Sequence, residues 1–108
     1  MIELTVLNYL SEELDVPVYM ETPEEIPESY VLIQKTGSGR DNRVDRATVA
    51  LQSIAPSLYE AAVLNENVKA AMDTMNDGIF GADLNSDYEY TNQQTKQYRY
   101  QAVYDIYY

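Results

Sequence analysis

The chain has 108 residues, of which 45% are hydrophobic, and carries a net charge of −11 from 18 acidic and 7 basic residues. This length and composition predict a single folded domain over residues 1–108. With no cysteine and no histidine, the chain can have no disulfide, thiol nucleophile, Ser-His-Asp triad or common zinc site. The negative charge is opposite to that of proteins that bind duplex DNA or anionic lipid, so we expect no specific nucleic-acid binding.

Two further features concern location and surface. No run of about 18 apolar residues is present, and the N-terminus lacks a basic-then-apolar signal pattern. We therefore expect no membrane association and a protein that stays where it is synthesised. Eleven tyrosines, one phenylalanine and no tryptophan indicate a surface rich in tyrosine, whose ring can be buried while its hydroxyl stays in water.

A helix is expected first, over residues 2–14, because apolar residues recur every four positions and face one side. These are Ile2, Val6, Leu10 and Leu14. The helix should end before Pro17, since a proline keeps the preceding residue out of the helical region. A short strand over residues 18–20 follows. Residues 21–29 then contain four carboxylates and two prolines, which favours a solvated acidic loop over a rigid metal cage.

Residues 30–35 form a mostly apolar segment that we expect to be a central strand. Residues 36–43 should connect it to the next strand as a hairpin with a long, flexible tip. Gly37 and Gly39 within this tip resemble part of a phosphate-binding loop, but no Lys-Ser/Thr pair follows and the segment leads into a strand.

Three of the seven basic residues, Arg40, Arg43 and Arg46, fall within this same stretch. They could pair locally with Asp41 and Asp45 and contribute little. Alternatively they form a basic finger that docks on an acidic partner. The candidate interaction site consists of Gly37, Gly39, Arg40, Arg43 and Arg46.

The most informative stretch runs over residues 44–75. Residues 44–53 alternate apolar and polar side chains, as a strand with one buried face does. Pro56 closes this strand, and Ser57 and Glu60 have the spacing of a capping box at a helix start. The helix should then bury one apolar stripe, made of Ala61, Leu64, Val68, Ala71, Met72 and Met75.

Gly78 should stop this helix in the left-handed conformation. Asp77, Asp83 and Asp87 do not have EF-hand spacing, so we expect no calcium site. Two strands should follow, over residues 87–92 and 96–108. Interleaved Tyr, Gln and Arg side chains there resemble an RNA-stacking platform, but a basic surround is absent and a cross-strand tyrosine ladder is favoured.

Together these elements predict an α+β fold in the order α-β-β-β-α-β-β. The architecture expected is a two-layer sandwich, with two helices packed on one face of a mostly antiparallel sheet of about four to five strands. The opposite sheet face should be polar and rich in tyrosine.

The segment from Ala47 to Met72 reads Ala-Thr-Val-Ala-Leu-Gln-Ser-Ile-Ala-Pro-Ser-Leu-Tyr-Glu-Ala-Ala-Val-Leu-Asn-Glu-Asn-Val-Lys-Ala-Ala-Met. This segment and the order of elements around it resemble the tail terminator, or tail-completion, proteins of tailed bacteriophages and prophages. The resemblance implies a two-helix subunit that forms a ring, often a hexamer, between the tail tube and the head. It further implies tail-tube and head-connector partners, and a location in the bacterial cytoplasm during assembly and then in the virion.

Two other classes of function are weighed against this one. The charge of −11 would suit a small acidic inhibitor or DNA mimic that binds a basic protein as a monomer or dimer. An enzyme using carboxylates and a metal lacks any recognisable constellation of residues. We therefore expect no enzymatic activity, no cofactor and no bound metal.

Overall fold

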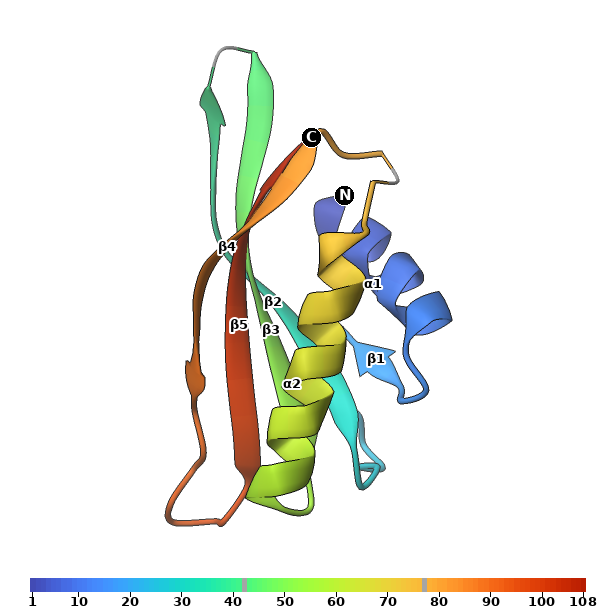
Figure 1. Ribbon diagram of the computed structural model, residues 1–108, viewed down its shortest axis with the longest axis vertical. Coiled ribbons are helices and arrows are strands. Elements are labelled where there is room, and N and C mark those ends of the chain that lie inside the picture. Colours follow the sequence, from blue (N-terminus) through green and yellow to red (C-terminus); the bar gives the residue numbers. More distant parts are fainter. Residues whose placement is uncertain (42, 77) are drawn as a thin grey trace.

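The computed structural model describes residues 1–41, 43–76 and 78–108. The chain forms two helices and one five-stranded sheet (Figure 1). In chain order these are α1 (Ile2–Glu13), β1 (Val18–Tyr19), β2 (Tyr30–Asp41), β3 (Val44–Ala55), α2 (Leu58–Asp73), β4 (Gly81–Glu89) and β5 (Tyr98–Tyr107). Both helices cover one face of the sheet, which confirms the predicted two-layer α+β architecture and its order of elements.

The sheet order is β1-β2-β3-β5-β4. Only β1 and β2 are parallel, and the other pairs are antiparallel. The central strand is therefore β3, and the expectation that residues 30–35 form a central strand was wrong. β2 has β1 on its other side at Val31 and Leu32 alone, which leaves it close to an edge.

The core lies between the helices and the sheet. Most of the predicted helix stripes are confirmed. In α1 the residues Ile2, Val6 and Leu10 are buried, whereas Leu14 is the extended C-cap and only partly buried. The predicted stripe of the second helix is buried throughout, with Met75 just beyond the end of α2. Strand residues of one parity, among them Val49, Leu51 and Tyr104, complete this cluster. Each Å² of apolar surface removed from water stabilises the fold by about 25 cal/mol, so this cluster is the main source of stability.

Ser57 begins α2 as predicted. Its hydroxyl accepts a hydrogen bond from the Glu60 amide at 3.1 Å. The second half of the expected capping box differs, because the Glu60 carboxylate accepts from the Ser57 hydroxyl at 3.0 Å. One free amide at the helix start is satisfied, and the carboxylate still lies at the positive end of the helix dipole.

The connection between β2 and β3 differs from the prediction. Residues 36–41 are strand, and Asp41 pairs with Val44, so strand pairing covers most of the stretch that was expected to be a long, flexible tip. A bulge between Lys35 and Gly37 absorbs the extra residue. A β-carbon on Gly39 would lie 3.2 Å from Nη2 at the end of the flexible Arg46 side chain, and one on Gly37 would meet no atom within 4 Å.

The strand expected over residues 87–92 lies earlier, at Gly81–Glu89. Its pairing comes from β5, which runs antiparallel to it from Tyr100 to Tyr107. Polar residues dominate β4, and an exposed edge strand of this kind has little hydrophobic alternation to mark it. Gly78 has φ +69, the left-handed conformation predicted for it, but α2 already ends at Asp73 with Thr74 as its C-cap, so the expectation that Gly78 stops the helix was wrong. In the described parts of the chain, no helix is long and apolar enough to cross a bilayer.

Candidate functional site

The β2–β3 hairpin projects beyond the rest of the molecule as an arm (Figure 1). We define the arm as residues 37–41 and 43–46. At its base, Arg46 pairs with Tyr107 of β5, and the Tyr108 amide donates to the Asp45 carbonyl at 2.8 Å. Outward from this point the described strand pairs are those between β2 and β3 themselves. A two-stranded ribbon of this kind gains its stability from backbone pairing, with no core beneath it.

All five predicted site residues lie in this arm. Arg40 and Arg43 are exposed near its end, whereas Arg46 and Gly39 face each other across the two strands nearer its base. Gly37 lies opposite Thr48, where the arm meets the body. Arg43 has φ +67, a left-handed conformation that non-glycine residues adopt at some cost.

Local pairing accounts for part of the arginine cluster. The Arg40 guanidinium lies 3.8 Å from the Asp45 carboxylate, with the two side chains 68% and 53% exposed. Such an exposed pair contributes about 0–1 kcal/mol. The side chain of Asp41, the other predicted partner, lies outside the described residues. The structure therefore shows the Asp45 part of the local-pairing alternative.

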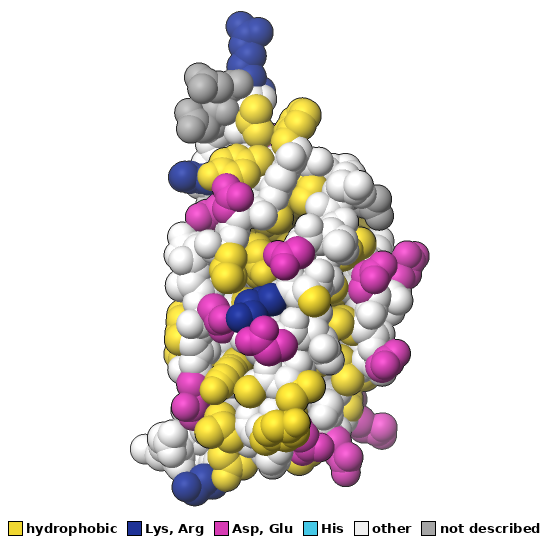
Figure 2. All heavy atoms as spheres, viewed as in Figure 1, with side chains coloured by type: hydrophobic (Ala, Val, Ile, Leu, Met, Phe, Trp, Pro, Cys, Tyr) yellow, Lys and Arg dark blue, Asp and Glu magenta, His cyan; other side chains and the backbone are white. Residues whose placement is uncertain are grey.

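The charge of the arm contrasts with that of the body. Three arginines and two aspartates fall within residues 40–46, whereas the whole chain carries −11 and no Lys or Arg precedes Lys35. Figure 2 shows basic side chains at the projecting end and acidic ones spread over the body. A positive tip on an acidic body favours contact with an acidic surface, including that of another copy.

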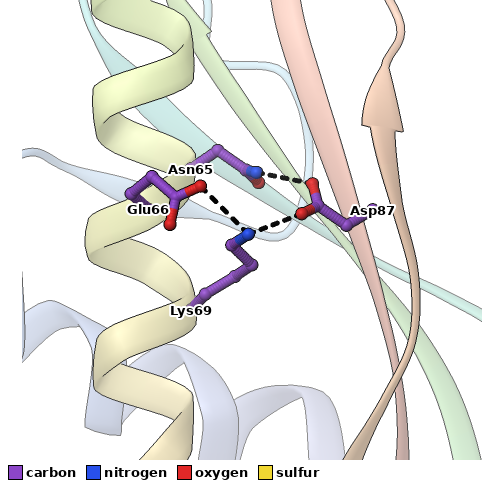
Figure 3. Close-up of polar contacts among 4 residues, drawn as sticks. All are labelled: Asn65, Glu66, Lys69 and Asp87. Carbon is purple, nitrogen blue, oxygen red and sulfur yellow. Dashed lines mark hydrogen bonds and ion pairs between the residues drawn. The ribbon is translucent and has the colours of Figure 1, made fainter.

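A second polar cluster joins α2 to edge strand β4 (Figure 3). Asp87 of β4 accepts from the Asn65 amide at 2.7 Å and from the Lys69 ammonium at 2.5 Å. Lys69 also pairs with Glu66 one helical turn away, at 3.0 Å. Asn65 is 3% exposed, so this link ties the edge strand to the helix from within the layer between them.

The cluster shifts the pKa of both charged partners. The hydrogen bond that Lys69 donates to Asp87, followed by the one it donates to Glu66, raises the pKa of Lys69 to about 12. For Asp87, burial acts to raise the pKa, but the hydrogen bonds from Lys69 and Asn65 outweigh it and the net pKa is lowered. Both groups are therefore charged at neutral pH, and the cluster holds the fold together and offers no free acid or base.

The uncovered sheet face is polar, as predicted, but has no continuous tyrosine ladder. The Gln52 amide donates to the Gln101 side chain at 2.9 Å, and the Gln101 amide donates to the Tyr88 hydroxyl at 2.6 Å. Aromatic contacts are confined to Tyr19 with Tyr30 and Tyr88 with Tyr90, each with ring centroids 6.0 Å apart. The favoured ladder was thus wrong in extent, since Ala102, Tyr104 and Ile106 of β5 belong to the core cluster on the opposite face.

Sequence reasoning missed Phe80 and the Lys69 cluster. Phe80, the one phenylalanine in the chain, is 82% exposed, and its amide donates to the Tyr107 carbonyl at 2.7 Å. Its neighbours Gly78 and Gly81 gave the segment the composition of a loop, which hid a large apolar side chain there. Asn65 within an otherwise apolar helix stripe was the available signal for the Lys69 cluster.

No group of three acidic side chains placed to hold a metal ion occurs among residues 1–41, 43–76 and 78–108. The predictions made for Asp77 lie outside the described residues. No protein-family model matches the chain, and no curated protein matches it either.

Proposed function

We propose that this chain is a structural subunit of a tailed phage or prophage, a tail terminator that assembles as a ring at the head–tail junction. The observation that carries the proposal is the arm: a projecting, net-positive hairpin on an acidic body. The resemblance of residues 47–72 supports it, as does the two-helix sandwich that this resemblance implies. The proposed partners are further copies in a ring, often a hexamer in the proteins that this segment resembles, together with tail-tube and head-connector proteins.

A ring requires two different surfaces on each copy that fit one another. The arm supplies a basic surface, and the N-terminal third supplies an acidic one, with eight carboxylates before Lys35. The remaining negative charge would suit a ring through which DNA passes, because like charge keeps the DNA from adhering. In this proposal the protein acts by assembling and performs no catalysis, in the cytoplasm of the host and then in the virion.

The test is rescue of tail completion by variants in a phage that lacks this gene. Changing Arg40 and Arg43 together to Glu places like charges against the acidic partner surface and should abolish rescue, because association is weakened by several kcal/mol. Changing the same two residues to Lys retains the charge and should preserve most of the rescue. Circular dichroism should show native folding for both, since the altered side chains are exposed.

Normal rescue by the Arg40→Glu, Arg43→Glu variant would refute the role given to the arm. The proposal of an acidic inhibitor or DNA mimic makes a different prediction. There the chain would act as a monomer or dimer on a basic protein, and the same double change would strengthen its binding. Light scattering after size exclusion, with and without a basic partner, distinguishes the two.

A further inference from the structure

An apolar groove lies at the β1 edge of the sheet, on the side opposite β4 in the strand order. It has a volume of about 550 Å³ and is lined by Leu7, Val18, Tyr19, Met20 and Glu21. Met20 is 38% exposed there, and methionine adapts readily to an aromatic ring. The groove leads directly into the acidic loop of residues 21–29, so one side is apolar and the other negatively charged.

The complementary features occur together at another part of the same chain. Phe80 precedes β4, and its neighbour Gly81 pairs with Tyr107, which in turn pairs with Arg46 of the arm. Phe80 therefore lies near the row of Arg46 at the base of the arm, two strands away, and Arg40 lies further out along the arm. At 82% exposure, Phe80 has no packing role that would explain a large aromatic at this position.

We infer that Phe80 and the arm of one copy dock on the β1 groove and acidic loop of the next copy. Phe80 enters the groove beside Tyr19 and Met20, and Arg40 and Arg43 face Glu21 and the carboxylates that follow it. Opposite charges thus meet around an apolar anchor, the usual anatomy of a protein interface. Because the two surfaces belong to different edges of one chain, the contact is head-to-tail and can close a ring. The inference rests on the proposed function and specifies its subunit contact.

The free strand edges are the alternative surface for a contact between copies. β2 has a bulge between Lys35 and Gly37, and β4 has one between Leu84 and Ser86. Bulges interrupt the regular row of backbone groups that strand addition needs, and they protect natural edges from it. The side-chain contact through Phe80 does not require a regular edge.

The test is photocrosslinking with the variant Phe80→p-benzoylphenylalanine, which keeps an aromatic ring in place. Tyr59→p-benzoylphenylalanine is the matched control, because Tyr59 is 78% exposed but lies in the first turn of α2. Each variant is mixed with isotopically labelled wild-type chain, irradiated and mapped by mass spectrometry. We expect crosslinks between chains from position 80 to residues 18–21, in at least tenfold higher yield than from position 59.

Equal yields from the two positions, crosslinks that map elsewhere, or none between chains would overturn the inference. A second measurement tests the groove contact independently of the proposed function. Phe80→Ala should raise the concentration needed for self-association at least tenfold, without lowering the melting temperature. If Phe80→Ala completes tails normally while the arginine double variant does not, the groove contact is refuted and the assembly function stands.

Discussion

The arm is a continuation of β2 and β3 beyond the body, yet different forces stabilise the two regions. In the body, β3 places Leu51 and Val49 under α2, both fully buried. In the arm, the same strand carries Val44, Asp45 and Arg46 with no helix over them, and the exposed ion pair there contributes little. A segment that adds so little to folding is more readily explained by contacts with another molecule. Substitutions in the body should therefore change stability, and substitutions in the arm should change association.

The largest expected difference is that between the stability losses of two truncations on β3. Leu51→Ala removes a fully buried side chain between the sheet and α2, and should cost about 2–5 kcal/mol of unfolding free energy. Val44→Ala in the arm should cost less than about 0.5 kcal/mol, as surface changes usually do. Urea denaturation of both variants measures the difference. Similar losses for the two would mean that the arm belongs to the folding core.

A smaller effect is expected where edge strand β4 is attached to the body. Asp87→Asn removes the charged acceptor for Lys69 and should cost about 1–2 kcal/mol at neutral pH. Because the folded-state pKa of Asp87 is lowered, this contribution is present above the pKa of an unfolded aspartate, about 3.9. It is lost as the pH falls through the lower pKa of the folded state.

The stabilisation by Lys69 depends on pH in the opposite direction. Its pKa is raised to about 12, so the stabilisation is complete below the pKa of an unfolded lysine and is lost as the pH rises through about 12. Because the Asp87 contribution is lost in acid, the melting temperatures of wild type and Asp87→Asn should differ at pH 7 and converge in strong acid. A difference that persists unchanged at pH 2 would contradict the ionic nature of the link.

The smallest effect compares the tips of the two hairpins. Arg43 and Lys96 both have positive φ, +67 and +56, and both are exposed. Glycine relieves the strain at either position but adds entropy to the unfolded chain, so each substitution should change the unfolding free energy by less than about 1 kcal/mol. Calorimetry of Arg43→Gly and Lys96→Gly tests this. A large loss at either tip would show that its side chain stabilises the fold.

The sequence predicted those features that depend on local patterns. The stripe on α2 and the cap at Ser57 follow from helical spacing, and the position of Gly78 follows from its freedom at positive φ. The extension of β2 through Gly37 and Gly39 could not be read in this way, because glycine is typical of turns and the strand here is defined by its pairing with β3.

Non-local contacts explain the remaining differences. The order of strands, with β5 between β3 and β4, depends on pairing between distant segments and has no periodic signal. The candidate arginines were recognised from their clustering alone, whereas Phe80 became visible only through its exposure beside β5. The clustering of charged residues can thus be recognised from the sequence, but the part of the folded surface where they lie cannot.

The central claim is that the arm is an assembly surface, and sedimentation velocity over a range of concentrations tests it most directly. Arg43→Glu and Lys96→Glu make the same change of charge at two exposed, positive-φ hairpin tips. Arg43→Glu should require at least tenfold more protein to associate than Lys96→Glu, which should behave as wild type, because only the first places like charges across the interface. Identical association of the two variants would contradict the claim.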